Sequence, residues 1–367
     1  EAFVTSATRT PLPVDLIHDL QQFMLSNDTS DAAFNSMALR VFKHQFQNNL
    51  PYQRYCQHLG KTPRFIKHWS EIPAVPINAF KDVTLSCYPS DLCERVFMTS
   101  GTTRAVRGRN FHPNLSIYDL SMRLYFAERF MQDQERIQMG ILFPTAQAMP
   151  NSSLAHYLGL ALTHFGTTNS RYFIDDQGLQ IDELCQTLEQ ICAQQSPYAL
   201  LGASYSFVPL MDELRSRQLR FPLPAGSRLF DTGGFKGQSR DIPLAEFYRD
   251  LHYFFGVKPE HCINMYGMTE LSSQLYDSGN ATVPSVKSGP HWTRFRLIDP
   301  ITGNTVPTGE PGVVVHYDLA NYNSVACLLT EDLGIAKEEG FQLLGRVEGA
   351  EAKGCSLAME SFLQAVQ

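Results

Sequence analysis

The chain has little of what marks secreted, membrane-spanning or nucleic-acid-binding proteins. Its eight cysteines form no Cys-x-x-Cys pair and no regular framework, which is typical of reduced thiols and makes zinc improbable. No basic run is longer than a few residues and the net charge is −7, so nucleic acid is not expected as a partner. No secretory signal precedes the first apolar residues, and the most apolar helix candidate, residues 153–165, is too short to cross a bilayer of about 30 Å. We therefore expect a cytoplasmic protein with no transmembrane segment.

What is present is an ordinary globular composition. The chain has 367 residues, of which 43% are hydrophobic and 18% charged, enough to bury a large core in two or three domains. No internal repeat or low-complexity tract interrupts it. The 24 phenylalanines and 15 tyrosines are mostly core residues and say little about a ligand.

The hydrophobic pattern predicts an α/β protein of four consecutive regions. Residues 1–80 read as helical, with Asp31 as a helix cap. Residues 81–288 alternate short strands and helices, which predicts βαβ units, a mostly parallel sheet and ligand-binding loops along one sheet edge. Residues 289–346 contain strands without helices, which predicts a small antiparallel β subdomain, and residues 347–367 form a C-terminal stub.

Two motifs in this order point to a nucleoside triphosphate and its metal. Thr99-Ser-Gly-Thr-Thr103 offers hydroxyls and backbone N–H groups that can wrap an anion, because glycine lets the chain approach closely. Tyr266-Gly-Met-Thr-Glu270 ends an apolar strand with a hydroxyl and a carboxylate, and carboxylates are ligands that Mg²⁺ prefers. Both motifs follow predicted strands, so we expect them at the same sheet edge.

These segments resemble the adenylate-forming acid ligases. That superfamily shows, in the same order, the hydroxyl loop, Gly233-Gly234, the Tyr266 motif, Thr330-Glu-Asp-Leu-Gly334 and Gly345-Arg346. Within it the chain is most similar to the acyl-protein synthetases of the bacterial luminescence system, the LuxE family, through its segments 231–237, 152–154 and 351–357. The resemblance covers roughly residues 70–360 and does not imply an organism that makes light.

The resemblance implies roles for the phosphate-binding and metal-binding residues. ATP and Mg²⁺ are the implied cofactors. Thr269 would contact phosphate, Glu270 would hold the metal, and Gly267 would line the acyl passage. The β- and γ-phosphates would lie against the loop residues Thr99, Ser100, Gly101, Thr102 and Thr103.

The resemblance also implies a place for the nucleoside. Gly233 and Gly234 would lie against the adenine, and Tyr266 would stack on it. Asp332 would bind the ribose hydroxyls, and Arg346 would assist at the ribose or a phosphate.

Two departures from the superfamily pattern are visible. Arg104 stands where glycine is usual, and Arg107 stands where a lysine is usual, a replacement that can still pair with phosphate. The usual C-terminal lid domain is essentially absent, and with it the lysine that serves adenylation; Lys353 is a weak candidate to replace it.

The acyl-protein branch implies an acceptor within the chain. Its acceptor is a cysteine near the C-terminus, and Cys355 is at the matching place. As a thiolate it would attack an acyl-adenylate and form a thioester, and Lys353 would lower its pKa modestly. The expected reaction is ATP-dependent activation of a carboxylic acid, with a fatty acid expected, followed by transfer to Cys355. An acyl reductase or an acyl-carrier protein is the expected protein partner.

Three alternatives stay open. The chain could be an acid–coenzyme A ligase of the phenylacetate-activating type, or a non-catalytic relic that binds nucleotide. A hydrolase is the third, because Gly202-Ala-Ser204-Tyr-Ser206 is similar to a nucleophile elbow, with Asp231 and His252 or His261 downstream. His156 and His164 are expected to be core histidines rather than catalytic bases.

Overall fold

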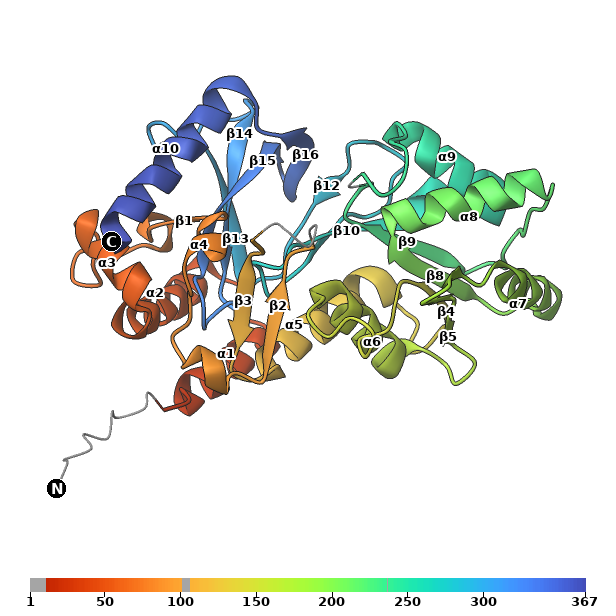
Figure 1. Ribbon diagram of the computed structural model, residues 1–367, viewed down its shortest axis with the longest axis horizontal. Coiled ribbons are helices and arrows are strands. Elements are labelled where there is room, and N and C mark those ends of the chain that lie inside the picture. The colour runs from red at the N-terminus through yellow and green to blue at the C-terminus, as the bar shows by residue number, and fades with distance from the viewer. Residues whose placement is uncertain (1–10, 101–105, 236) are drawn as a thin grey trace.

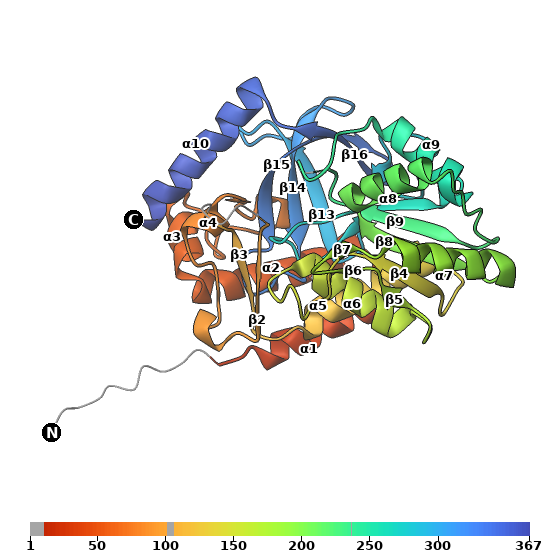
Figure 2. The same ribbon diagram turned by 45° about the vertical axis from the view of Figure 1, so that its right-hand side comes forward.

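The computed structural model describes residues 11–100, 106–235 and 237–367. Figure 1 shows two halves that lie side by side, each built around its own sheet. The same division is visible after the turn shown in Figure 2. The α/β class predicted from the sequence is therefore observed.

The half on the right of Figure 1 is a sheet covered by helices. Its strands have the order β11-β10-β9-β8-β4-β5, and they run parallel except that β11 is antiparallel to β10. Because helices cover both faces, every residue of β8 is buried. The elements are β4 (Gln138–Leu142), α6 (Ser153–Phe165), β5 (Arg171–Tyr172), α7 (Ile181–Gln194), β8 (Tyr198–Ala203), α8 (Ser204–Ser216), β9 (Arg228–Thr232), α9 (Leu244–Phe255), β10 (Cys262–Tyr266) and β11 (Leu275–Tyr276).

The half on the left is built on a second sheet of six strands, which is antiparallel except for one edge pairing. Its order is β12-β16-β15-β14-β13, and β1 runs parallel to β15. This sheet is as large as the first one, so the prediction of a small β subdomain is wrong. The strands are β1 (Val75–Pro76), β12 (Val286–Lys287), β13 (Thr293–Ile298), β14 (Gly312–Asp318), β15 (Cys327–Lys337) and β16 (Gly340–Arg346).

Antiparallel pairings outnumber parallel ones among the described strands. A mostly parallel arrangement therefore holds for one sheet and not for the molecule. The strand-and-helix alternation predicted the first sheet. The second was underestimated because its edge strands β1 and β12 come from outside residues 289–346.

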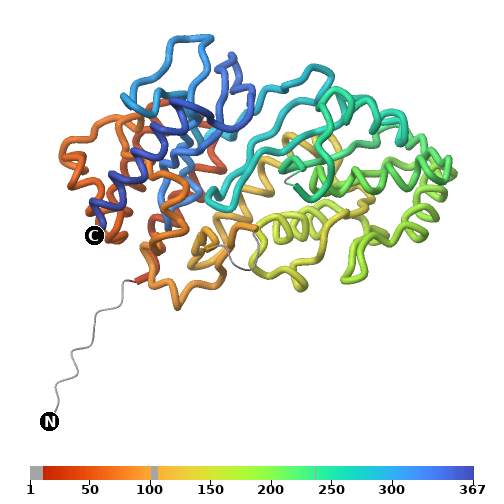
Figure 3. Tube along the Cα trace, turned by 45° about the horizontal axis from the view of Figure 1, so that its top comes forward, coloured from red at the N-terminus to blue at the C-terminus, as the bar shows by residue number. Residues whose placement is uncertain are grey.

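Early and late parts of the chain pack together beside the second sheet. Helix α10 (Gly349–Val366) lies against α3 (Leu50–His58), as the neighbouring orange and blue segments of Figure 3 show. The ring of Phe362 meets that of Tyr55 edge-on at 5.0 Å between centroids. Both side chains are buried. The predicted regions 1–80 and 347–367 thus share one packed core.

The remaining helices lie mostly in the left half. Helix α2 (Asp31–Asn48) is capped by Ser30, whose Oγ accepts from the Ala33 N–H, so the prediction of Asp31 as the cap is off by one residue. No helix within the described ranges is long and apolar enough to cross a membrane. The other short elements are α1 (Val14–Leu25), η1 (Trp69–Glu71), α4 (Ala79–Asp82), η2 (Ser90–Leu92), α5 (Ser116–Phe126), η3 (Ala127–Met131) and η4 (Pro259–His261).

The hydroxyl loop stands in the sequence between two strands that belong to neither of the large sheets. It connects β2 (Arg95–Met98) to β3 (Arg109–His112), which pair only with each other in a separate antiparallel hairpin. The expectation that this loop follows a strand of the parallel sheet is therefore wrong, since its strand pairs locally. The Tyr266 motif does follow a strand of that sheet, β10. A further small pair is formed by β6 (Ile174–Asp175) and β7 (Gly178–Leu179).

Candidate active site

A cavity of about 530 Å³ lies between the two halves and takes lining residues from both. The right half contributes the chain after β9 and β10, and the left half contributes β15 and the end of β16. Of the predicted site residues, the described ones that line it are Thr99, Ser100, Gly233, Gly234, Tyr266, Gly267, Thr269, Glu270, Asp332 and Arg346. Residues far apart in the sequence are thus gathered at one place.

Three predicted residues of the hydroxyl loop, Gly101, Thr102 and Thr103, lie outside the described residues, as does Arg104. Their predicted contact with phosphate stays a prediction. The described ends of the loop are near the cavity, because Thr99 and Ser100 line it and the Gly108 N–H donates to Thr99 Oγ1 at 2.9 Å.

Gly233 and Gly234 form a turn directly after β9. Their φ angles are +82° and +65°, a region that side chains disfavour, so glycine is required for the chain to turn here. The turn leaves backbone rather than side chains at the cavity wall. A flat ring could therefore approach closely.

Tyr266 is held at the cavity wall by a buried polar contact. Its hydroxyl donates to Asp332 Oδ2 at 2.6 Å and lies 2.9 Å from His316 Nε2. Burial lowers the pKa of His316 to about 3, so its ring is neutral. Burial also raises the pKa of Asp332, while the hydrogen bond from Tyr266 opposes that shift. The ring of Phe341 meets Tyr266 edge-on, which fixes the tyrosine plane.

Arg346 and Asp332 are direct neighbours across two strands. They are paired in the register of β15 and β16. The Arg346 guanidinium donates to Glu331 Oε2, and its side chain is 73% exposed. The arginine therefore stands at the cavity mouth with freedom to reach a ligand.

Thr269 and Glu270 are fixed through their backbone. Asn110, which follows the hydroxyl loop in β3, donates to the Thr269 carbonyl at 3.0 Å and to Asn321 Oδ1 at 3.1 Å. Asn321 in turn donates to the Glu270 carbonyl at 2.9 Å. These amides tie β3, the strand that follows the hydroxyl loop, to the Tyr266 motif.

Glu270 is the described residue best suited to hold Mg²⁺. Its side chain is buried at the cavity. It lies close to the backbone of Gly108, because a Cβ added to that glycine would be only 3.0 Å from Glu270 Oε1. No group of three or more acidic, histidine or cysteine side chains that could hold a metal is found in the part of the chain that the structure describes. A single carboxylate suits Mg²⁺, which binds one or two carboxylates together with substrate phosphates and water.

A second cavity of about 620 Å³ adjoins the first. Both are lined by Thr99, Ser100, Gly233, Met265, Gly267, Met268 and Thr269. The second extends between α6 and β8 and is lined there by apolar and aromatic side chains such as Leu154, Tyr157 and Ala203. Arg107 lines this cavity and not the first, so the structure places it nearer the second cavity than its predicted phosphate role suggests.

Cys355 is not brought to either cavity. It lies in α10 and is 7% exposed, and its Sγ is 3.9 Å from the Thr330 carbonyl oxygen of β15. Burial, with smaller contributions from Glu331 and Glu351, raises the pKa of its thiol to about 11. The predicted lowering of this pKa by Lys353 is therefore wrong, because burial and nearby carboxylates outweigh a lysine in the same helix.

Ser204 is not activated as a hydrolase nucleophile. Its Oγ donates to Asp231 Oδ2 at 2.6 Å and contacts the Thr232 carbonyl at 3.0 Å, with no histidine between serine and aspartate among the described contacts. The two histidines considered for a triad, His252 and His261, are exposed. His156 pairs with Asp119 at 2.7 Å. The segment therefore resembles a nucleophile elbow in sequence only, and the hydrogen bond from Ser204 to Asp231 is structural.

Sequence reasoning missed two polar residues at the cavity floor, Asn264 and Lys287, and it named Asp231 only as the acid of a possible hydrolase triad. Asn264 stands two positions before Tyr266 in the same strand, so the alternation of side chains directs both to one face. That spacing was the available signal. Asp231 is opposite Asn264 in the register of β9 and β10, which no sequence pattern reveals.

Comparison with known families settles the chain's family. The model of the acyl-protein synthetase family, LuxE, matches residues 6–364. The chain belongs to the acyl-protein synthetase family. This confirms the resemblance seen in the sequence, and acyl activation followed by ligation is the activity of that family.

Two curated relatives agree with this family. The long-chain-fatty-acid–luciferin-component ligase of Vibrio harveyi is 23% identical over 337 residues, which is 89% of this chain and 86% of the relative. The enzyme of the same name from Aliivibrio fischeri is 23% identical over 345 residues, covering 90% and 88%.

Solved structures with a similar fold are ligases too. A 2-hydroxyisobutyryl-CoA ligase with its acyl-adenylate bound has a TM-score of 0.64 at 15% identity, covering 86% of this chain and 68% of that one. The same ligase in a thioester-forming state has a TM-score of 0.59 and covers 93% and 70%. At this identity the likeness shows a shared adenylate-forming fold.

Proposed function

We propose that this chain activates a long-chain fatty acid with ATP and passes the acyl group to a thiol. The observation that carries the proposal is the junction of the two cavities. The first cavity gathers the residues implied to bind a nucleotide, and the second has an apolar and aromatic part between α6 and β8. Both are lined by Gly233 and Gly267. An adenylating enzyme needs this arrangement, because a carboxylate has to reach the α-phosphate. The names of the curated relatives supply the long-chain acid.

In the proposed complex the nucleoside occupies the deeper part of the first cavity. The adenine lies between the Gly233–Gly234 turn and Tyr266. Asp332 receives the ribose hydroxyls, a role for which its Oδ1 is suited because Oδ2 already accepts from Tyr266. Arg346 reaches the ribose or a phosphate from the cavity mouth.

The triphosphate then extends toward Thr269 and the hydroxyl loop. Thr99 and Ser100 donate to phosphate oxygens, together with the predicted residues Gly101, Thr102 and Thr103. Glu270 holds Mg²⁺, which would neutralise charge on the phosphates when bound. Arg107 approaches from the second cavity and stabilises the charge that develops between acid and phosphate.

The first step joins the two substrates at the junction. A carboxylate oxygen of the acid attacks the α-phosphorus, forming an O–P bond, while the bond to the β-phosphate breaks and pyrophosphate leaves. The Gly233 and Gly267 backbones leave room for this in-line approach. The acyl chain stays in the apolar cavity beside Leu154 and Tyr157, where water is excluded.

The second step forms a thioester. A thiolate attacks the acyl carbon, forming a C–S bond, and AMP leaves with the electrons of the C–O bond. Cys355 is the proposed acceptor, yet its sulfur is buried behind β15. Transfer to Cys355 therefore requires α10 to leave its place, after which the acyl group becomes available to a reductase or an acyl-carrier protein.

The buried thiol is also the observation that favours a second candidate. If α10 stays in place, the acceptor is a thiol from solution such as coenzyme A, as in the ligases of similar fold. A relic that only binds nucleotide is the remaining possibility, and it predicts no pyrophosphate release.

One experiment separates these three functions. The full chain is incubated with ATP, Mg²⁺ and a panel of fatty and aryl acids, and its intact mass is measured. A gain of one acyl group, lost in neutral hydroxylamine and absent in Cys355→Ser, supports acyl-protein synthesis and identifies the acid. Pyrophosphate release without an adduct, rising when coenzyme A is added, identifies a coenzyme A ligase. No adduct and no pyrophosphate would contradict the ligase proposal.

A further inference from the structure

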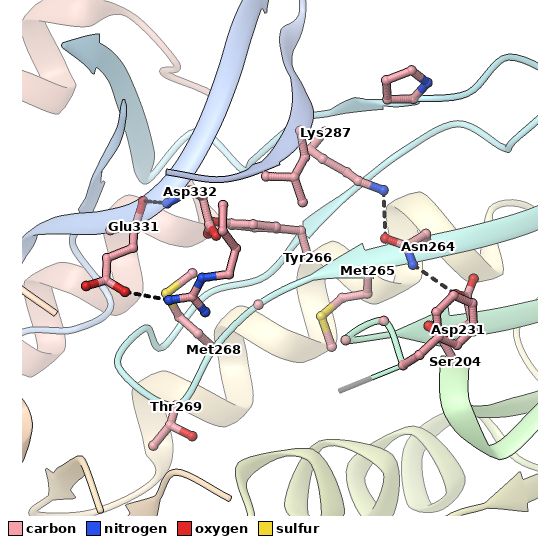
Figure 4. Close-up of a pocket in the computed structure, with 18 of the residues that line it drawn as sticks. Ser204, Asp231, Asn264, Met265, Tyr266, Met268, Thr269, Lys287, Glu331 and Asp332 are labelled. Atoms are coloured by element: carbon pink, nitrogen blue, oxygen red, sulfur yellow. Dashed lines mark hydrogen bonds and ion pairs between the residues drawn. The ribbon is translucent and has the colours of Figure 1, made fainter. Parts of the chain in front are cut away.

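The floor of the first cavity carries a row of polar side chains centred on one amide, that of Asn264. Figure 4 shows Lys287, Asn264 and Asp231 in a row, joined by hydrogen bonds. Lys287 Nζ donates to Asn264 Oδ1 at 2.7 Å, and Asn264 Nδ2 donates to Asp231 Oδ2 at 3.0 Å. All three residues line the cavity. They come from three strands or strand ends, β12, β10 and β9.

Lys287 is fully engaged within the protein. Besides Asn264 it donates to Asp277 Oδ2 at 3.0 Å and to Ser285 Oγ at 2.9 Å. An ammonium has three N–H donors and no acceptor, so none is left for a ligand. The lysine is therefore not a phosphate ligand, and its effect on a bound molecule passes through Asn264.

Asp231 is engaged in the same way from the other side. Its Oδ1 accepts from the Tyr248 hydroxyl at 2.8 Å and its Oδ2 accepts from Ser204 Oγ at 2.6 Å, in addition to the Asn264 amide. Three donors converge on this buried carboxylate. Asp231 is thus an acceptor toward Asn264.

These partners fix which way the Asn264 amide points. Turned by half a rotation, its NH₂ would face the Lys287 ammonium and its oxygen would face the Asp231 carboxylate. Donor would then face donor at Lys287, and acceptor would face acceptor at Asp231. Among buried groups both contacts are strongly unfavourable. Asn264 consequently offers a ligand one remaining acceptor position on Oδ1 and one remaining N–H.

This pattern matches one purine and not the other. Adenine carries an exocyclic N–H donor beside a ring-nitrogen acceptor, and an asparagine amide pairs with that edge through two hydrogen bonds. Guanine carries an oxygen acceptor at the same exocyclic position, which would face Asn264 Oδ1. A flipped amide would donate to that oxygen and accept from the neighbouring guanine N1–H, so it would accommodate guanine on its N1 edge. The flip is what Lys287 and Asp231 prevent.

We propose that Lys287 and Asp231 are positioning residues that lock the Asn264 amide and make this cavity select adenine over guanine nucleotides. The inference rests on the proposed function, since it takes the first cavity as the nucleotide site. Neither residue touches the reacting phosphate. Their role is to decide which base is accepted.

The test is the ratio of two affinities. Binding of ATP and of GTP to the full chain is measured by calorimetry for the natural sequence and for Lys287→Gln, whose amide tolerates either orientation of Asn264. We expect the natural chain to prefer ATP by roughly a hundredfold, the discrimination of one good bidentate pair. In Lys287→Gln the preference should fall to about fivefold or less, through tighter binding of GTP as well as weaker binding of ATP. A merely structural role would weaken both nucleotides equally and leave the ratio unchanged, which would overturn the inference.

Three further variants keep the test decisive. Lys81→Gln removes another lysine that lines the same cavity and should leave the ratio unchanged. Lys287→Arg keeps a charged donor and should keep the preference. If Lys287→Gln does not fold, Asp231→Asn releases the amide from the other side and should lower the ratio in the same way. A natural chain that binds both nucleotides equally overturns the inference and leaves the proposed function standing, whereas one that binds neither overturns both.

Discussion

Strand β15 separates two very different environments, an open cavity and a buried thiol. On one side Thr330, Glu331 and Asp332 line an open polar cavity. On the other side the Thr330 carbonyl lies 3.9 Å from the sulfur of Cys355, which is sealed under α10. The side that would bind ATP is assembled and accessible, while the side that would receive the acyl group is closed.

The difference teaches that the two half-reactions make different demands on the fold. The adenylation side is buttressed by amides such as Asn110 and Asn321, which fix the backbone around Thr269 and Glu270. Among the described residues these contacts are in place without a bound substrate. On the thiol side the proposed acceptor Cys355 lies in a helix that would have to be displaced, so the rate of transfer would be set by a conformational step.

The largest effect is expected from a substitution in the proposed adenylation site that leaves Cys355 and α10 untouched. Glu270→Gln keeps the shape of the side chain and removes its charge, so the metal loses its protein carboxylate. We expect pyrophosphate release to fall roughly 10²–10³-fold, the loss typical of one electrostatic contact in a transition state. Glu270→Asp should retain more activity and need more Mg²⁺. Full activity in Glu270→Gln would remove Glu270 from the metal site.

The second-largest effect is expected when the packing of α10 over Cys355 is weakened. Phe362→Ala removes a ring that is buried against Tyr55 and anchors α10. Truncating a buried phenylalanine costs about 3–5 kcal/mol of stability. If this loss falls on the docking of α10, the population of its undocked state should rise about a hundredfold or more. Alkylation of Cys355, followed by mass spectrometry, should accelerate accordingly. Leu357→Ala, on an exposed position of the same helix, should not accelerate it.

A smaller effect concerns pH. Burial raises the pKa of Cys355 to about 11, above its ordinary value, so the folded protein holds the thiol proton more tightly than the opened one. The docking of α10 is therefore fully stable below the ordinary pKa and weakens as pH rises toward about 11. Alkylation of Cys355 should rise about tenfold per pH unit up to that value. A plateau near the pKa of an ordinary thiol would show that Cys355 is not buried.

The smallest effect is at the cavity mouth. Arg346 is largely exposed and paired with Glu331, an interaction of little net strength. Arg346→Ala should raise the KM for ATP less than about fivefold and leave kcat nearly unchanged. A large loss of kcat would place Arg346 at the reacting phosphate.

The sequence could predict the residues that follow β9 and β10. Apolar strand patterns ending in Gly233-Gly234 and in Tyr266 directly indicate where side chains and turns meet at the edge of a parallel sheet. These local patterns locate one wall of the cavity. They do not locate the hydroxyl loop, because β2 and β3 pair with each other rather than with the sheet.

What the sequence could not predict depends on contacts between distant residues. The lock on Asn264 exists because strand register places it opposite Asp231 and because Lys287 reaches it from β12. Cys355 is buried because α10 packs on α3, from early in the chain, and on strands β1 and β15. Neither register nor such long-range packing leaves a periodic trace in the sequence.

The pairing of β1 with β15 and of α3 with α10 has a consequence for synthesis on the ribosome. The parallel sheet uses residues 138–276, a continuous stretch that can fold as it emerges. The left half joins residues made early to residues made late, so Tyr55 and its neighbours stay uncovered until α10 has been translated. During synthesis this chain therefore carries an open apolar surface until α10, the helix that covers it, has been made.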